Sequence, residues 1–446
     1  MSNSPSFFEK MNNWIRNSVM VKLISMAILI LLLLIPTSMV ESLITEREYR
    51  RSDTIYEISN TWGNAQTLTG AVVTVPYLTY FTNEQKEVVS QVEYAHFLPE
   101  NLQFEGEIFP EKRYRALYEV VVYVAELAVK GNFGQIDFSE WNIRAEDVLW
   151  DKAFLSIGIT DMRGIQEKIM LQWQDSTFSL NPGIETSDVI KSGVSVKVPF
   201  AETSGDIDFS YKLKLNGSRD LYFVPLGEEN MVNIKSTWAD PSFVGSFLPD
   251  EKNISPAGFD ANWRVLHLNR NYPQSWKGPA FQVEASAFGV NLLVPVDHYQ
   301  KSTRSAKYAV MFIALTFLIF FFVEILNRKR IHPIQYILVG LAICLFYTLL
   351  VALSEHISFN LAYLVSAVAT IALITLYVSS VFKSQKLTAL CSLVLIILYG
   401  FLFTLLQLQD YALLLGSIGL FITLSIVMYL SRNIDWYNFI NKTEEE

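Results

Sequence analysis

The chain has 446 residues, of which 51% are hydrophobic, and a formal net charge of −9. The acidic excess lies in residues 41–306. This argues against binding nucleic acid by simple electrostatics, because such binding requires an excess of Lys and Arg. The two cysteines, Cys344 and Cys391, both fall in long apolar runs. Residues 41–306 therefore contain no disulfide and must be stabilised by their own core.

The N-terminal region combines a polar, mildly basic segment, residues 1–22, with an apolar run at residues 23–40. Two interpretations fit this pattern: a cleaved secretory signal peptide and an uncleaved signal anchor. The leading segment is long for a signal peptide, and Pro36–Met39 is a poor small-x-small cleavage site. We therefore expect residues 23–40 to form a first transmembrane helix.

Residues 41–306 have the pattern of a mostly β domain behind a helical stalk. The stalk, Glu41–Asn60, is rich in Glu and Arg and has a loose apolar stripe. β-Branched and alternating runs follow it, for example at residues 69–77 and 209–215. Asn216-Gly217 is a typical turn dipeptide and predicts a turn before residues 221–224. We expect a twisted sandwich or stacked sheets, joined to the following helices without a flexible linker.

The C-terminal third is a block of five apolar runs, residues 307–430, followed by a short tail, residues 431–446. Each run has about twenty residues, enough for a helix to cross roughly 30 Å of hydrocarbon. The predicted fold class is an α+β membrane protein with one N-terminal transmembrane anchor helix, a large mostly-β periplasmic domain and a five-helix C-terminal transmembrane block. The five predicted helices are 309–326, 336–353, 361–382, 387–406 and 411–430.

The short loops predict the orientation of these helices. Lys and Arg occur in the N-terminal segment, in residues 327–330, in residues 383–386 and after the last helix, whereas residues 354–360 and 407–410 have none. Because basic loops stay in the cytoplasm, we expect both termini to be cytoplasmic and residues 41–306 to be periplasmic. The predicted location is the bacterial inner membrane, with the lipid bilayer as a partner.

Common catalytic and cofactor motifs are absent from the sequence. There is no Walker A loop, G-x-G-x-x-G, H-E-x-x-H, C-x-x-C or G-x-S-x-G pattern, and no two of the five histidines have metal-pair spacing. The sequence therefore predicts a protein that is not an enzyme and has no catalytic residues, no cofactor and no metal.

Glu355 and His356 are the most suggestive candidate functional residues. They follow an apolar helix at its predicted outer end, beside the bilayer. Ionisable groups inside a membrane are usually functional, but at an interface they are tolerated. The pair fits a proton relay, a contact between the loop and the soluble domain, or an interfacial helix cap together with Ser354.

His332 and Asp410 are weaker candidates that both occur where a helix is expected to begin. His332 precedes Pro333, which is favoured in the first turn of a helix. Asp410 precedes the last apolar run, where capping explains an acidic residue. Glu324 is expected to pair with Arg328 one turn later. No predicted helix carries a charge at its centre, which weakens but does not remove a transporter interpretation.

Several stretches together resemble the CreD family of bacterial inner-membrane, cell-envelope integrity proteins. In the membrane block they are HPIQY at 332–336, LSEH at 353–356, DYALLLGS at 410–417 and DWY at 435–437. In the outer domain they are TLTG at 67–70, TDMRGI at 160–165, PSF at 241–243, GSFLP at 245–249, and GVN at 289–291 leading to PVD at 295–297. The resemblance runs from the anchor to residue 437.

The resemblance implies a non-enzymatic inner-membrane protein linked to envelope stress, and the family brings no catalytic residues to assign. On this hypothesis the periplasmic domain binds or senses an envelope protein or cell-wall component. The alternative is a transporter or lipid-handling protein with a path through the C-terminal helices and with Glu355 and His356 at its outer mouth.

Overall fold

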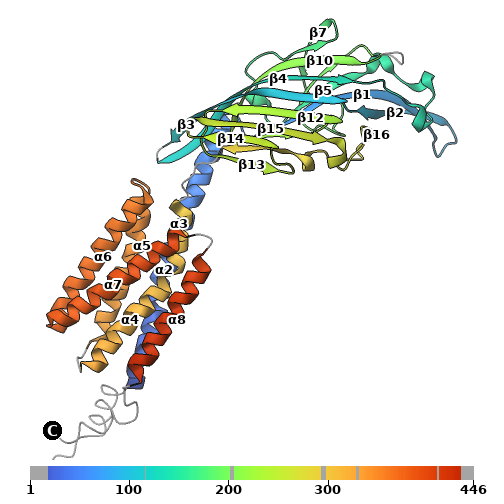
Figure 1. Ribbon diagram of the computed structural model, residues 1–446. Coiled ribbons are helices and arrows are strands. Elements are labelled where there is room, and N and C mark those ends of the chain that lie inside the picture. Colours follow the sequence, from blue (N-terminus) through green and yellow to red (C-terminus); the bar gives the residue numbers. More distant parts are fainter. Residues whose placement is uncertain are drawn as a thin grey trace, which may run out of the picture. The chain divides into compact units, whose positions relative to one another are not determined.

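The computed structural model describes residues 19–115, 117–200, 205–292, 298–327, 331–408 and 411–432. The chain divides into a helical unit, Met1–Arg50 with Val296–Glu446, and a β-rich unit, Arg51–Pro295. Helix α2 (Val19–Trp62) contributes to both units (Figure 1). The predicted fold class is confirmed: an apolar N-terminal helix, a large β-rich domain and a C-terminal block of apolar helices in one α+β chain.

The helical unit places the predicted apolar runs on separate helices. Six described helices, α2 among them, are long and apolar enough to cross a membrane. The predicted anchor and the predicted stalk are parts of the same helix α2. A short amphipathic helix, α3, precedes the C-terminal block. The helices after α2 are α3 (His298–Lys307), α4 (Ala309–Leu326), α5 (Pro333–Ser354), α6 (Phe359–Phe382), α7 (Gln385–Gln407) and α8 (Ala412–Ser431).

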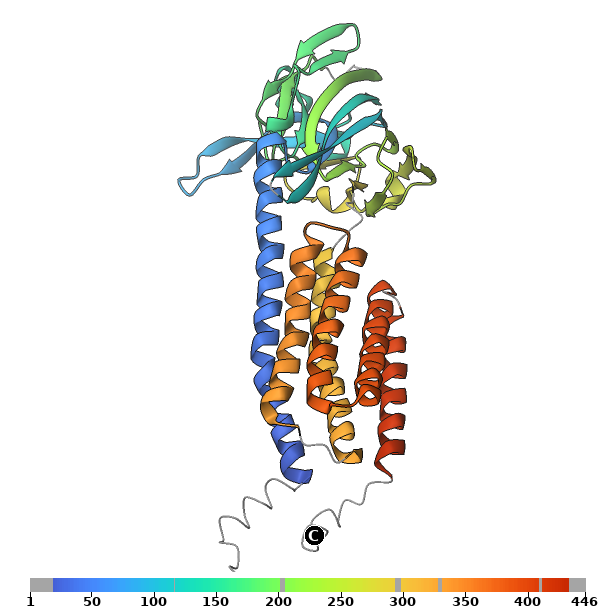
Figure 2. The same ribbon diagram turned by 90° about the vertical axis from the view of Figure 1, so that its left-hand side faces the viewer.

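Burial differs sharply among these helices. Within the most apolar window of each helix, 61% of the α4 residues and 56% of the α5 residues are buried, but none of the α8 residues. Helix α5 packs against α6, and α6 against α7, while α8 lies beside α7 at one edge of the group (Figure 2). Helices α4 and α5 therefore supply most of the protein-facing surface. Helix α8 packs one partly buried face against its neighbours, with Val427 and Leu430 near α4, and exposes the rest of its apolar surface.

The β-rich unit consists of two sheets. In the nine-stranded sheet the order is β13-β17-β11-β1-β5-β9-β8, with β2 paired to β1 and β16 to β2. The second sheet has the order β14-β15-β12-β3-β4-β10-β6-β7. The strands of the first sheet are β1 (Gln66–Thr82), β2 (Val88–Phe97), β5 (Phe154–Ile159), β8 (Asn181–Pro182), β9 (Gly193–Lys197), β11 (Asp220–Val224), β13 (Pro241–Gly245), β16 (Ser275–Lys277) and β17 (Phe288–Leu292). Those of the second are β3 (Asn101–Arg115), β4 (Tyr118–Phe133), β6 (Met170–Trp173), β7 (Ser176–Ser179), β10 (Ile207–Ser218), β12 (Glu229–Ser236), β14 (Glu251–Ser255) and β15 (Gly258–Leu266).

One hydrophobic core joins the two sheets, and the strand sequences explain which faces build it. Strand β10 alternates buried residues such as Phe209 and Leu213 with exposed residues such as Ser210 and Lys212. The second sheet is therefore apolar on one face and solvated on the other. Strand β1 is buried at nearly every position up to Tyr77, so both faces of the first sheet are covered along this strand.

The prediction of a turn at Asn216-Gly217 was wrong. Strand β10 continues through both residues to Ser218, and the left-handed residue is Arg219, with φ 63°. Strands β10 and β11 then lie in different sheets. Gly217 serves packing instead, because a Cβ atom there would collide with the ring of Tyr123.

Candidate functional sites

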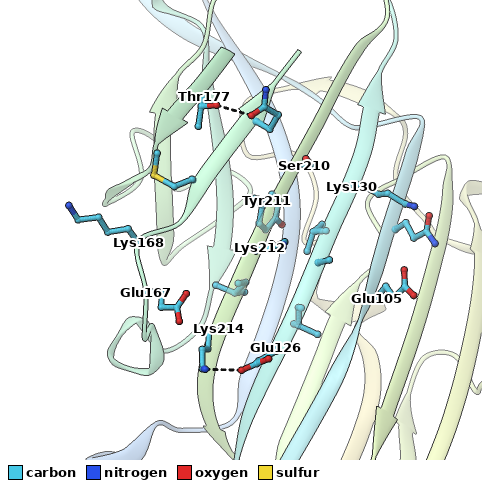
Figure 3. A pocket seen from close by; sticks show the side chains of 17 residues that line it. Glu105, Glu126, Lys130, Glu167, Lys168, Thr177, Ser210, Tyr211, Lys212 and Lys214 are labelled. Atoms are coloured by element: carbon cyan, nitrogen blue, oxygen red, sulfur yellow. Dashed lines mark hydrogen bonds and ion pairs between the residues drawn. The ribbon is translucent and has the colours of Figure 1, made fainter. Parts of the chain in front are cut away.

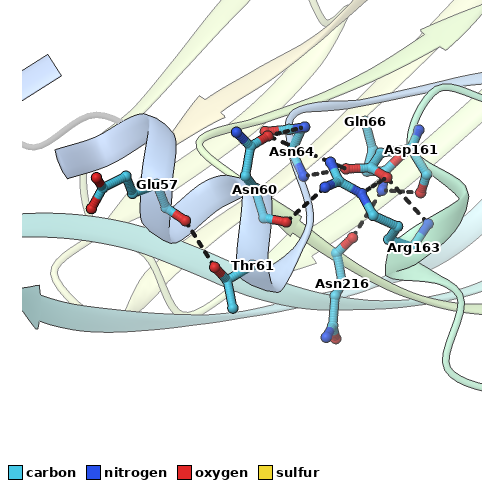
Figure 4. A network of polar contacts seen from close by, with 8 residues as sticks. All are labelled: Glu57, Asn60, Thr61, Asn64, Gln66, Asp161, Arg163 and Asn216. Carbon is cyan, nitrogen blue, oxygen red and sulfur yellow. Dashed lines mark hydrogen bonds and ion pairs between the residues drawn. The ribbon is translucent and has the colours of Figure 1, made fainter. Parts of the chain in front are cut away.

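The end of α2 is fixed to the β-rich unit by a polar network that we call the junction: Asn60, Asn64, Gln66, Asp161, Arg163 and Asn216 (Figure 4). Arg163 donates from Nη1 to the main-chain oxygen of Asn60 at 2.8 Å. It also donates to the Asp161 carboxylate from Nε at 2.9 Å and from Nη2 at 2.7 Å. A guanidinium at a helix C-terminus satisfies a free carbonyl and complements the helix dipole.

Asp161 and Gln66 complete the junction. The Asp161 carboxylate accepts the main-chain N–H of Asn64 at 2.9 Å, and its pKa is lowered to about 2, mainly by the hydrogen bonds from Arg163. Gln66, which is fully buried, donates to the carbonyls of Asp161 at 3.0 Å and Asn216 at 2.9 Å and accepts the Asp161 N–H at 3.1 Å. The network thus connects α2, β1, the turn after β5, and β10.

Aromatic and ionic contacts strengthen the same connection. The Trp62 indole donates to the carbonyl of Tyr123 at 3.2 Å, and the Arg113 guanidinium lies 3.8 Å from the Trp62 ring centroid. Arg115 forms an ion pair with Glu57 at 2.5 Å. The last turns of α2 are therefore part of the β-rich unit and not a free stalk.

The solvated face of the second sheet carries an open groove of about 790 Å³ (Figure 3). Its charged side chains are both acidic and basic, and Lys214 forms an ion pair with Glu126 at 2.7 Å. The charged residues that line it are Glu105, Glu126, Lys130, Glu167, Lys168, Lys212 and Lys214. This pattern is that of a mixed, well-hydrated sheet surface.

At one end of the helical unit, Glu355 lies in a nearly closed polar contact. Its side chain is 7% exposed, it accepts a hydrogen bond from the Tyr299 hydroxyl at 2.9 Å, and it lies 3.7 Å from Arg47 Nη1. His356 is exposed, and the described residues provide no hydrogen bond or ion pair to its ring. The structure therefore connects Glu355 to α2 and α3 and leaves His356 outside this contact.

Glu324, near the C-terminal end of α4, forms a similar cluster. Its side chain is 5% exposed, it lies 2.8 Å from Lys22 Nζ, and it accepts from the Tyr336 hydroxyl at 3.0 Å. Arg328, its predicted partner, lies outside the described residues. No sequence pattern indicates Lys22 as a partner of Glu324, because the two residues are distant in the chain.

Of the two weaker candidates, His332 and Asp410, His332 caps a helix. His332 is the N-cap of α5: its Nδ1 accepts the Ile334 N–H at 3.3 Å, and Gln335 accepts the His332 N–H at 3.0 Å. Asp410 lies outside the described residues. His332, Glu355 and Glu324 all belong to helix ends, and the structure does not gather His332 and Glu355 into one site.

His96 is a buried polar residue that sequence reasoning did not single out. Its ring is bound on both sides, with Nδ1 3.0 Å from the Thr74 hydroxyl and Nε2 3.2 Å from the Asp188 carboxylate. Burial lowers the pKa of His96, and Asp188 partly opposes this effect. No local motif could reveal the site, because the partners are 22 and 92 residues away in sequence.

Within the described ranges, no group of three or more His, Cys, Asp or Glu side chains could hold a metal ion. The two cysteines are buried in α5 and α7 and unpaired.

Comparison with known proteins gives a consistent result. The family model "Inner membrane protein CreD" matches residues 18–437. The chain is also 34% identical over 418 residues to the inner membrane protein CreD of Escherichia coli (strain K12), and the match covers 92% of each chain.

Proposed function

Because the chain belongs to the CreD family of inner membrane proteins, we propose that it supports cell-envelope integrity and the envelope-stress response without catalysing a reaction. Its β-rich unit binds or senses an envelope component or a partner protein. Its helices hold this unit at the inner membrane and transmit its state. The family is named for a membrane protein and not for an enzyme, which supports a non-catalytic role.

We further propose that both termini are cytoplasmic and that residues 41–306 are periplasmic, with helices at 23–40, 309–326, 336–353, 361–382, 387–406 and 411–430. The distribution of Lys and Arg among the short loops supports this orientation. A large folded unit between the first two helices is compatible with it, because long domains are translocated largely regardless of their charge.

The observation that carries the proposal is the junction. A domain that merely shields the membrane needs no specific contact with its anchor. Here a buried Gln66, the Asp161–Arg163 ion pair and the last turn of α2 share one hydrogen-bond network. A connected network of this kind favours one arrangement of the helix end, as signal transmission through α2 requires.

The test is complementation of a deletion strain by full-length variants, with survival of envelope damage as the readout. Arg163→Ala is expected to lose rescue, while Lys214→Ala, which removes an exposed ion pair on the groove of Figure 3, is expected to retain it. Both proteins must be present in the membrane at wild-type level. Full rescue by Arg163→Ala would contradict transmission through the junction.

A transporter or lipid-handling role is the second candidate, and one observation favours it. The hydroxyls of Tyr347, Ser366 and Tyr399 are buried inside the helical unit and have no hydrogen-bond partner among the described residues. Glu355→Gln and His356→Ala distinguish this role, because a path with both residues at its mouth requires both. Wild-type rescue by both variants would remove its residue-level support.

A further inference from the structure

A second hollow in the β-rich unit, of about 560 Å³, lies on the nine-stranded sheet. Its floor comes from β1 and β5, including Thr67, Thr69 and Gly158, and Tyr222 of β11 borders it. Residues 282–287, which precede β17, form a wall. The volume falls within the range of typical small-molecule sites.

Gly158 keeps the floor of this pocket open. A Cβ atom at this position would lie 2.6 Å from the Cβ of Thr69 and 3.2 Å from the Cγ2 of Ile190, both of which line the pocket. Any larger side chain would therefore occupy the floor or displace its walls. The hollow depends on a residue without a side chain near the end of β5, beside an irregularity in the pairing of β5 with β1.

The side chains that line the pocket are mostly neutral hydrogen-bonding groups. Thr67, Ser192 and Gln282 have no side-chain hydrogen bond to another described residue, so their donors and acceptors are available. Tyr222 adds an aromatic ring with a polar end. Lys191 and Glu284 contribute opposite charges that balance. The groove of Figure 3, by contrast, is lined by seven charged side chains.

We propose that this pocket binds a segment of a neutral oligosaccharide. Several uncharged donors and acceptors around one aromatic ring match a ligand with many hydroxyl and amide groups and no net charge. The proposal rests on the ligand-binding role proposed above and names the class of ligand.

The pocket is also placed to affect the junction. The Thr160 hydroxyl, on its edge, accepts the Thr67 N–H at 3.1 Å and donates to the Thr67 carbonyl at 3.1 Å. The next residue is Asp161, which binds Arg163 and the end of α2. A saccharide bound against Thr67 and Thr160 therefore contacts the strand ends that hold the junction.

The test uses the full-length protein in detergent, titrated calorimetrically with chitotetraose, an uncharged oligomer of N-acetylglucosamine. We expect saturable binding by the wild type. Ala285→Trp fills the pocket from an exposed wall position and should weaken binding by about tenfold or more, equivalent to about 1.4 kcal/mol. Thr67→Val, which removes one hydroxyl, should weaken it less.

The matched control is Ala128→Trp, which places the same side chain in the groove of Figure 3 and should bind like the wild type. Absence of wild-type binding, unchanged binding by Ala285→Trp, or loss in Ala128→Trp would each overturn the proposal. The complementation test separates the two levels: if Arg163→Ala loses rescue but chitotetraose does not bind, the signalling role stands and the saccharide site does not.

Discussion

The two portions of α2 are held in different ways. In the helical unit, only 17% of its apolar window is buried, and two ion pairs fix it: Lys22 with Glu324 and Arg47 with Glu355. In the β-rich unit, its last turns are held by the many hydrogen bonds of the junction. The two basic residues are about 37 Å apart along the helix, close to the thickness of a bilayer.

The difference follows from the surroundings of each portion. Lipid offers no competing hydrogen-bond partners, so an ion pair to a buried carboxylate gives a membrane helix a defined register. Water competes at the surface of the β-rich unit, so many mutually supporting bonds are needed there. Within the helical unit, the 2.8 Å contact of Lys22 is tighter than the 3.7 Å contact of Arg47, and the variants below test this order.

Glu324→Leu is expected to have the largest effect. It leaves the buried Tyr336 hydroxyl without its acceptor, which should lower the free energy of unfolding by about 3 kcal/mol. Lys22, whose side chain is 32% exposed, loses its carboxylate at a smaller cost. Thermal unfolding of the full-length protein in detergent measures the loss. The double variant Lys22→Met, Glu324→Leu should recover part of it, because no unpaired charge remains. A double variant no more stable than the single one would refute the ion-pair explanation.

Asp161→Asn should come next, with a loss of about 2 kcal/mol, because it removes a charged acceptor from four N–H donors. Hydrogen exchange should accelerate at the amides of residues 60–64. Since the pKa of Asp161 is lowered to about 2 from 3.8, its contribution is present above pH 3.8 and lost as the pH falls through about 2. Asp137→Asn, in an exposed loop, is the control and should leave this exchange unchanged.

The sequence predicted these connections unevenly. The apolar runs predicted where the helices occur, because an apolar stretch of about twenty residues has few structural alternatives to a membrane-spanning helix. The anchor and the stalk were recognised, but not as one helix. Asn216-Gly217 was misread because turn propensity is local, whereas the need for a glycine there comes from the ring of Tyr123, which is distant in sequence.

The candidate sites show the same limit. The sequence singles out Glu355 because a carboxylate beside a membrane helix is unusual, but the only partners that it names are the neighbours His356 and Ser354. Tyr299 and Arg47 come from α3 and α2, and no spacing rule relates them to Glu355. Asp161 and Arg163 belong to a stretch that resembles the family, but the sequence assigns them no role. Their role follows from their hydrogen bonds to Asn64 and Asn60 at the end of α2.

Glu355→Gln should cost less than Glu324→Leu, about 1 kcal/mol, because the amide still accepts from Tyr299 and the lost contact with Arg47 is long. His356→Ala should leave the thermal midpoint unchanged, since its ring is exposed. Measuring Glu355→Gln and Glu324→Leu in the same detergent tests whether the Arg47 and Lys22 contacts of α2 differ in strength. A larger loss for Glu355→Gln than for Glu324→Leu would reverse the order proposed here.

The smallest effect on stability is expected at His96, whose two hydrogen bonds lie in the interior of the β-rich unit. Burial lowers its pKa from 6.5, so the folded protein resists protonation while the unfolded chain accepts a proton. Stability should therefore fall as the pH drops below 6.5, by less than the limit of about 1.4 kcal/mol per pH unit for one proton. Asp188, which faces His96, reduces the slope. His96→Asn should abolish this component of the pH dependence of thermal unfolding. His267→Asn, at an exposed histidine, is the control and should retain it. An unchanged slope in His96→Asn would mean that another group causes the pH dependence.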